Sequence, residues 1–176
     1  IYFKFHIKKV DKFIAISETT KLSIEKYLNI KKNKIWMIYN YTELEKKKII
    51  KTHSSNTINF TFIGMITKRK NILSMIKGIR LLYEANANVK LFIIGNNGNA
   101  LKEIKDYITL HKLQNVVKIL LNCSENQKKQ ILESTFCFLH PSHLEGFCYP
   151  VIEAMSYGLP IIYNDIDIFN EIIGGY

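Results

Sequence analysis

Two glutamates, Glu145 and Glu153, stand close together in the sequence, and Gly146 directly follows the first. A carboxylate accepts hydrogen bonds through both oxygens, so each glutamate could hold the vicinal hydroxyls of a sugar. Gly146 carries no side chain and would let the backbone approach a ligand closely. The residues alone also allow a second interpretation, a capped helix in which the dipole favours Glu153 while Glu145 is merely solvated.

The residues around these glutamates predict a strand, a loop, a short helix and a second strand. Residues 135–140 form an apolar run without alternation, which is typical of a fully buried strand. Pro150 suits the first residue of a helix, and Gly158 suits the residue just past its end. Pro160 then opens a second short apolar run, residues 160–163. The free N–H groups at the helix start, together with the helix dipole, would bind phosphate or another anion.

A similar succession of strand, glycine and helix begins at residue 58. Residues 58–63 predict a strand that ends at Gly64, and apolar residues at three- and four-residue intervals predict an amphipathic helix over residues 72–83. Three basic residues, 68–70, lie between the glycine and this helix. Cations added to a helix dipole would make a second anion site. The alternative is a basic turn that is simply solvated.

The rest of the chain repeats the alternation of strand and helix. We expect further strands at residues 89–94 and 116–120, and helices at residues 100–111 and 124–133, the last begun by a capping box. Such alternation predicts an α/β fold with a parallel, Rossmann-like sheet and right-handed crossovers. Ligands of these sheets bind beyond the carboxyl ends of the strands. The residues that follow strand ends in this interpretation are Gly64, Lys70, Gly95, Glu145 and Glu153.

The N-terminal part predicts a smaller strand, helix and strand unit. Residues 10–16 and 35–39 have the composition of strands, and Ser17 is placed to cap a helix that runs roughly to Leu28. Residues 41–57 are polar and charged, which favours a linker. We therefore expect two parts, residues 1–53 and residues 54–176.

The stretch that contains both glutamates resembles the signature of the retaining glycosyltransferases of family 4, which have the two-domain GT-B fold. Gly-Phe follows Glu145, and Ala-Met-x-x-Gly-x-Pro follows Glu153. The resemblance is densest over residues 58–173 and covers mostly the C-terminal, donor-binding domain. It implies that the chain is a fragment. Residues 1–53 would be the end of the N-terminal domain plus the linker, and residues 54–176 would be a donor-binding domain that is incomplete at its C-terminus.

The resemblance also implies roles for individual residues. Glu145 and Lys70 would be catalytic, because the glutamate contacts the donor sugar and the lysine neutralises the leaving diphosphate. The backbone of Gly146 and Phe147 would lie near that diphosphate, and Glu153 would hold the nucleotide ribose. The other donor-binding residues that it implies are Gly64, Arg69, Gly95 and Cys148.

Two positions depart from the family pattern. The family's Gly-Arg-x-x-x-x-Lys element has Met65 at its arginine, and methionine cannot bind phosphate, so Arg69 or Lys68 would have to compensate. Cys148 stands where the family usually has glycine, and a positive φ there would strain a cysteine.

Composition narrows the remaining function classes. The 176 residues carry a net charge of +10, which raises nucleic acid, anionic membrane or a polyanionic substrate as a partner. Lysine, isoleucine and asparagine are frequent throughout, so we interpret the charge as a compositional bias, and the densest cluster, residues 45–48, as a solvated segment. The chain has no recognition helix, aromatic ribonucleoprotein pattern or zinc ligands, so no nucleic-acid partner is expected. Its three cysteines are widely spaced, which fits a reducing cytosol and neither a zinc site nor a redox motif.

The function that the resemblance implies is transfer of a sugar from a nucleotide-diphosphate-sugar donor to a glycan or lipid-linked saccharide, with retention of configuration. The donor is a co-substrate, and neither a cofactor nor a metal is expected, because Lys70 and the helix N-termini neutralise the diphosphate. Met65 and Cys148 favour the alternative, a non-catalytic module that binds nucleotide or sugar. No apolar run has the length of a transmembrane helix, so we expect a cytoplasmic location and leave open a peripheral contact with the inner face of the membrane.

Overall fold

A computed structural model describes residues 7, 9–40 and 56–174, which form two compact units. Unit 2 contains the described residues of the ranges 44–144 and 149–164. Unit 1 contains those of the ranges 1–43, 145–148 and 165–176. The basic cluster at residues 45–48 and the predicted boundary after residue 53 lie outside the described residues.

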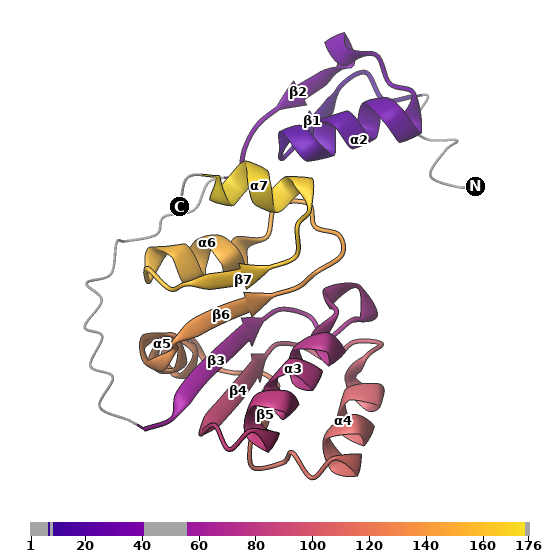
Figure 1. Cartoon of the computed structure of the whole chain (residues 1–176). Helices are drawn as coiled ribbons and strands as arrows, with labels where there is room; N and C mark the ends of the chain where they lie inside the picture. The colour runs from indigo at the N-terminus through magenta and orange to yellow at the C-terminus, as the bar shows by residue number, and fades with distance from the viewer. Residues whose placement is uncertain (1–6, 8, 41–55, 175–176) are drawn as a thin grey trace. The chain divides into compact units, whose positions relative to one another are not determined.

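Unit 2 is built on a five-stranded sheet in which every neighbouring pair is parallel, as Figure 1 shows. The strand order is β5-β4-β3-β6-β7. This confirms the α/β, parallel-sheet fold class predicted from the sequence. The strands are β3 (Ile58–Ile63), β4 (Val89–Ile94), β5 (Val117–Leu120), β6 (Cys137–His140) and β7 (Ile161–Tyr163).

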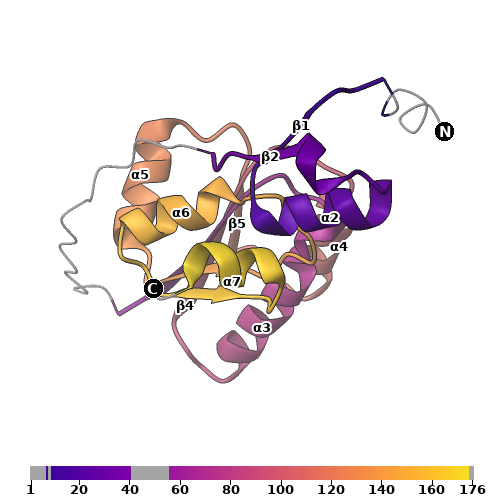
Figure 2. The same cartoon turned by 90° about the horizontal axis from the view of Figure 1, so that it is seen from above.

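The helices of unit 2 lie on both faces of this sheet. Helices α3 and α4 lie on one face and α5 and α6 on the other (Figures 1 and 2). From β3 the chain adds β4 and β5 on one side, then returns to add β6 and β7 on the other, so the order reverses between β3 and β6. Open parallel sheets bind ligands at such a point, beyond the carboxyl ends of the strands. The helices are α3 (Ile72–Glu84), α4 (Leu101–Leu110), α5 (Glu125–Ser134) and α6 (Tyr149–Ser156).

The core of unit 2 follows from the apolar strands. All four residues of β6 are buried, as its unbroken apolar run predicted, and Cys137 packs there as a small hydrophobic side chain. The hydroxyls of Thr61 and Thr135, both buried, lie 2.6 Å apart and satisfy one another. These two hydroxyls inside the core are therefore paired, which avoids the cost of burying them alone.

The predicted helix signals of unit 2 are mostly confirmed. Ser124 and Gln127 form the capping box of α5. Gly158 ends α6 with φ 58°, and the N–H of Leu159 donates to the carbonyl oxygen of Ala154, as in a Schellman motif. Helix α6 begins at Tyr149, so Pro150 is its second residue rather than its first.

The basic turn that the sequence places before α3 is a short 3₁₀ helix. The basic residues form a 3₁₀ turn, η2 (Lys68–Lys70), and Asn71 then takes a left-handed conformation with φ 53° before the helix begins. Asparagine tolerates this conformation better than most residues, so the chain can change direction there.

The described residues of unit 1 include a small parallel pair of strands, the α-helices α2 and α7, and a short 3₁₀ helix. Ser17 caps α2 as predicted, and its side chain accepts a hydrogen bond from the N–H of Thr20. The two strands are shorter than their apolar runs, because only three residues of each strand pair in register. No helix in the described part of the chain has the length and apolar character to cross a membrane. The elements are β1 (Phe13–Ala15), α2 (Glu18–Leu28), η1 (Lys32–Lys34), β2 (Ile35–Met37) and α7 (Asp167–Ile173).

Candidate functional site

The carboxyl ends of β3 and β4 meet at two glycines whose backbones approach closely. The N–H of Gly64 donates to the carbonyl oxygen of Ile94 at 2.9 Å. A Cβ atom added to Gly95 would lie 1.9 Å from the carbonyl oxygen of Gly64, closer than any side chain tolerates. Both glycines were predicted from the sequence as site residues. The structure explains why residue 95 is a glycine, since any larger residue would push the ends of β3 and β4 apart.

A third glycine, Gly98, continues this close approach and was not predicted. A Cβ atom on it would lie 2.5 Å from the carbonyl oxygen of Ile66, and the N–H of Ala100 donates to that same oxygen at 3.1 Å. The loops after β3 and β4 are therefore joined backbone to backbone. The sequence signal was present in the run Gly-Asn-Asn-Gly that follows β4.

Lys70 lies directly beside the end of β3. Its side chain is buried, with 7% of its surface exposed, and its Cε atom lies 3.7 Å from the position that a Cβ atom on Gly64 would occupy. The lysine stem therefore packs against the Gly64 position at ordinary contact distance. Lysine is seldom so buried, because its ammonium group loses hydration, and here it adds a positive charge beside the strand end.

Polar contacts join the turn before α3 to the loop after β6, across the point where the strand order reverses. The N–H of His143 donates to the carbonyl oxygen of Arg69 at 3.0 Å, and the Arg69 guanidinium donates to the carbonyl oxygen of Leu144. The buried hydroxyl of Ser142 lies 3.3 Å and 3.2 Å from these two oxygens. We call Arg69, Ser142, His143 and Leu144 the clasp. Arg69, predicted to bind the donor, is here part of the clasp.

His140 is the last residue of β6 and is fully buried. Its ring stacks on Phe62 of β3, with centroids 5.2 Å apart, and on Phe138 of its own strand at 6.0 Å. These ring contacts join β3 to β6 and give the histidine a structural place in the core.

Glu153 lies on α6 and forms an ion pair with α5. Its Oε1 atom lies 2.9 Å from the Nζ atom of Lys128, and the same Nζ lies 2.8 Å from Glu125. Burial by itself lowers the pKa of Lys128, but its hydrogen bonds to both glutamates outweigh burial, so the pKa is raised. Lys128 therefore stays charged at neutral pH. It was not predicted, because nothing in the sequence pairs residue 128 with residue 153.

The other predicted residues, Glu145–Cys148, belong to unit 1. The carbonyl oxygen of Gly146 lies 2.9 Å from the Ser17 hydroxyl and 3.3 Å from that of Thr20. Phe147 is buried, and its ring centroid lies 6.4 Å from that of Tyr39. Glu145 is half-buried.

Cys148 has the positive φ that the sequence analysis considered for this position. Its φ is 68°, in the left-handed region where glycine is at ease and a cysteine is strained. The side chain is nevertheless buried, with 8% exposed. The loop has therefore kept the backbone conformation that suits glycine while carrying a side chain.

Within unit 2 the predicted residues fall into two groups. Gly64, Lys70 and Gly95 lie together at the ends of β3 and β4, next to the clasp that contains Arg69. Glu153 lies apart on α6, in its ion pair with Lys128. The first group has the backbone and cation that suit an anion, and the second has a carboxylate that suits hydroxyl groups.

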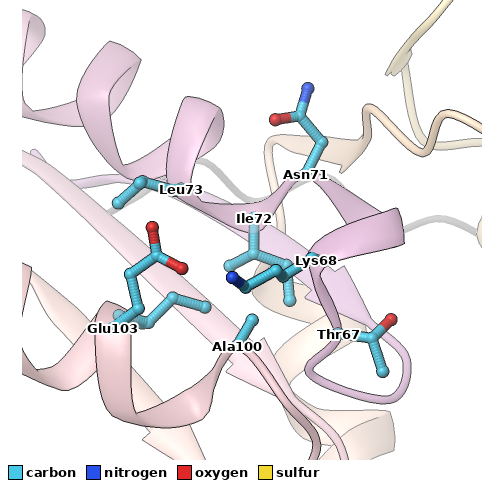
Figure 3. Close-up of a pocket in the computed structure, with 8 residues that line it drawn as sticks. Thr67, Lys68, Asn71, Ile72, Leu73, Ala100 and Glu103 are labelled. Carbon is cyan, nitrogen blue, oxygen red and sulfur yellow. The ribbon is translucent and has the colours of Figure 1, made fainter.

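A shallow pocket lies between η2, the start of α3 and the start of α4, as Figure 3 shows. Apolar side chains line much of it, and Lys68 and Glu103 place opposite charges on its two sides (Figure 3). Among the residues that the sequence offered for phosphate binding, Lys68, a possible substitute for the arginine missing at Met65, lines it. Its mixed charge does not favour an anion, so we place the candidate site at the strand ends instead. The lining residues are Thr67, Lys68, Asn71, Ile72, Leu73, Ala100, Glu103 and Ile104.

The chain also resembles known proteins in sequence. Residues 43–176 match the family described as Glycosyl transferases group 1. The O-antigen chain mannosyltransferase RfbU of Salmonella typhimurium is 28% identical over 98% of this chain and 48% of its own length. An uncharacterized glycosyltransferase of Methanocaldococcus jannaschii is 30% identical over 93% of this chain and 42% of its own. The chain thus spans about half the length of these curated relatives.

Solved structures share the fold. Anabaena HepE, determined in complex with UDP and glucose, matches with a TM-score of 0.78 and 20% identity over 92% of this chain and 46% of its own. WaaG, a glycosyltransferase involved in lipopolysaccharide biosynthesis, matches with a TM-score of 0.77 and 15% identity over 93% of this chain and 46% of its own. At such identities the likeness concerns the fold alone.

Proposed function

The chain belongs to the family of glycosyl transferases group 1, and from that premise we propose that it supplies the donor-binding part of a sugar transfer reaction. The donor would be a nucleotide-diphosphate sugar and the acceptor a saccharide or a lipid-linked saccharide. The observation that carries this proposal is the grouping of Gly64, Gly95 and buried Lys70 at the strand ends. Relatives whose names include mannosyltransferase and galactosyltransferase activities support it.

In the proposed mechanism the chain acts on the leaving diphosphate through charge and backbone. Gly64 and Gly95, which follow β3 and β4, would let a diphosphate lie close to the backbone. The Lys70 ammonium group would neutralise the negative charge that develops on the diphosphate as its bond to the sugar breaks. This stabilisation grows as the leaving group forms, so it lowers the barrier rather than only tightening binding. We propose that these groups serve in place of a metal ion.

The two glutamates would hold the two ends of the donor. Glu153 would accept hydrogen bonds from the ribose hydroxyls, and Glu145 would contact the donor sugar, with the Gly146–Phe147 backbone near the diphosphate. We further propose that the sugar is transferred with retention at the anomeric carbon. The resemblance of residues 145–160 to retaining enzymes of family 4 supports this stereochemistry.

The test is nucleotide-dependent thermal stabilisation. UDP, GDP and ADP, each with and without a linked sugar, are added to the protein and to Glu153→Ala, with Glu133→Ala on α5 as a matched surface control. A ligand present at a hundred times its Kd raises the stability by about 2.7 kcal/mol, which is a shift of several degrees. We expect one nucleotide to shift the wild type and the control but not Glu153→Ala. Equal shifts in all three proteins would contradict the donor site.

Met65 favours a second candidate function, a module that binds the nucleotide sugar without turnover. It stands where the family has arginine, and its side chain is 54% exposed beside the strand end. The two functions differ in turnover, so donor hydrolysis and transfer are measured on the wild type and on Met65→Arg. Nucleotide binding without turnover, with activity gained in Met65→Arg, would identify the module. Turnover by the wild type in the presence of a chelator would support the metal-independent enzyme, and the anomeric configuration of its product tests retention.

A further inference from the structure

We infer that Lys128 is a positioning residue for the nucleotide, and that it acts by holding the carboxylate of Glu153 in the orientation that accepts ribose hydroxyls. This inference rests on the proposed function, in which Glu153 holds the ribose. It adds a residue on α5, a helix that the family signature of residues 145–160 does not include.

The geometry gives Lys128 control over Glu153. The Nζ atom lies 2.9 Å from one carboxylate oxygen, Oε1, and both side chains are largely covered, with 20% and 22% exposed. A charge-assisted hydrogen bond of this length restricts the rotation of the carboxylate more firmly than a bond to a neutral donor would. A carboxylate offers about four acceptor positions, so the contact with one ammonium group leaves it capacity to accept hydrogen bonds from a diol.

Glu125 completes the arrangement. It lies one helical turn before Lys128 on α5, and its Oε2 atom lies 2.8 Å from the same Nζ. Glu125 is itself largely exposed, with 85% of its side-chain surface accessible, so it anchors the lysine from the solvent side. Two carboxylates around one ammonium raise the pKa of Lys128 and keep it charged, so the hold on Glu153 persists over the neutral pH range.

Two other roles would predict different results. If the pair only tied α5 to α6, its loss would lower stability and affect all ligands alike. If Lys128 contacted the phosphates directly, its loss would weaken every diphosphate nucleotide, whether or not it carries ribose hydroxyls. A positioning role instead predicts a loss confined to nucleotides that have both hydroxyls.

The experiment compares the Kd of UDP, GDP or ADP, whichever binds, with the Kd of its 2′,3′-dideoxy form. The proteins are the wild type, Lys128→Met, Glu153→Ala and the double variant, with Lys129→Met as the control. Lys129 is the adjacent residue on α5, and its side chain is 56% exposed, with its Nζ atom 3.9 Å from Oε1 of Glu133. It therefore has the same charge and lies on the same helix as Lys128 but pairs with a different glutamate. Thermal unfolding of each variant is recorded by circular dichroism.

We expect Lys128→Met to weaken the ribonucleotide about tenfold, the size of one charge-assisted hydrogen bond, and to leave the dideoxy form unchanged. Glu153→Ala should abolish the preference for the ribose form, and the double variant should bind no more weakly than Glu153→Ala, because both changes remove one interaction. A further variant, Lys128→Arg, keeps the positive charge and should retain part of the preference for the ribose form that Lys128→Met loses. Lys129→Met should bind as the wild type does.

Three results would overturn the inference, and they separate it from the proposed function. Loss of the preference in Glu153→Ala but not in Lys128→Met refutes the role of Lys128 and leaves the donor site standing. Equal weakening of both nucleotide forms in Lys128→Met refutes positioning in favour of a structural or phosphate role. A preference that survives in Glu153→Ala, or no binding of any of the three nucleotides, refutes the proposed ribose contact and this inference with it.

Discussion

Units 1 and 2 secure their candidate segments by different kinds of contact. In unit 2 the backbones at the ends of β3 and β4 pack so tightly that no side chain fits at Gly95. These ends belong to a five-stranded sheet with helices on both faces. In unit 1 the segment Glu145–Cys148 is held by hydroxyl groups on the Gly146 carbonyl oxygen, beside a sheet of only two strands. Forcing a new side chain into a closely packed site typically costs about 1–3 kcal/mol, whereas a single hydrogen bond contributes only about 0.5–1.5 kcal/mol.

Unit 1 also contains a carboxylate that binds the N-terminus of a helix. The carboxylate of Glu171 on α7 accepts hydrogen bonds from the N–H groups of Glu18 and Thr19, at 2.7 Å and 2.9 Å, and from the Thr19 hydroxyl. These donors are at the N-terminus of α2, where the helix dipole also favours a negative charge. Glu171 thus occupies the anion position of this helix with a group from the chain itself, whereas the strand ends of unit 2 are proposed to receive an external anion.

The difference predicts that a single methyl group damages unit 2 more than the loss of a polar group damages unit 1. Gly95→Ala should lower the free energy of unfolding by about 3 kcal/mol, because its Cβ atom would displace the Gly64 backbone. Gly78→Ala is the matched control, since nothing lies within 4 Å of its added Cβ, and alanine in mid-helix should stabilise by about 0.5–1 kcal/mol. Urea unfolding followed by far-ultraviolet circular dichroism measures both. Equal stability of the two variants would contradict the steric account.

A smaller effect is expected from Glu171→Gln in unit 1. It should lower the free energy of unfolding by about 1–2 kcal/mol at pH 7, because the amide replaces a charged acceptor. Burial raises the pKa of Glu171, but the hydrogen bonds from Thr19, Glu18 and Tyr39 outweigh it, so the pKa lies below its ordinary value. A lowered pKa stabilises the fold fully above the ordinary carboxyl pKa, and this stabilisation is lost as the pH falls through the lowered value.

The measurement for Glu171 uses Trp36, the chain's single tryptophan, which lies on β2 of unit 1. Its fluorescence follows the unfolding of unit 1 in urea at a series of pH values from 7 downward. The gap between wild type and Glu171→Gln should narrow as the pH falls below the ordinary carboxyl range. A gap that stays constant over that range would show that the charge of Glu171 contributes nothing.

The smallest expected effect is the difference in free energy of unfolding between the loss of one helix cap in unit 1 and the loss of one in unit 2. Ser17→Ala removes a buried cap that also contacts the Gly146 carbonyl oxygen, and should cost about 1–2 kcal/mol. Ser124→Ala removes an exposed cap of α5 and should cost about 0.5–1 kcal/mol. Trp36 fluorescence reports the first and circular dichroism the second. A larger cost at Ser124 would show that burial and the Gly146 contact add nothing to the cap.

Much of this structure could be predicted because its signals are local. The apolar runs located all five strands of unit 2, and Ser17, Ser124 and Gly158 marked helix ends through bonds that reach only a few residues along the chain. The proximity of Gly64, Lys70 and Gly95 could be predicted because carboxyl ends of parallel strands share one edge of a sheet. The turn at residues 68–70 was predicted but its 3₁₀ form was not, because a basic run gives no sign of the left-handed Asn71 that follows it.

The sequence by itself determined the order of strands and helices, the family and the residue types at the strand ends. Hydrophobic periodicity, helix caps and motifs each depend on residues that are close together in the chain. Only the tertiary structure decided which distant groups meet. It joined Arg69 to the loop after β6, gave Glu153 its partner Lys128, and placed Glu171 on the start of α2. Side chains that meet across elements do so through crossovers and packing, and a hydrogen bond between residues far apart in the chain leaves no pattern in either segment alone.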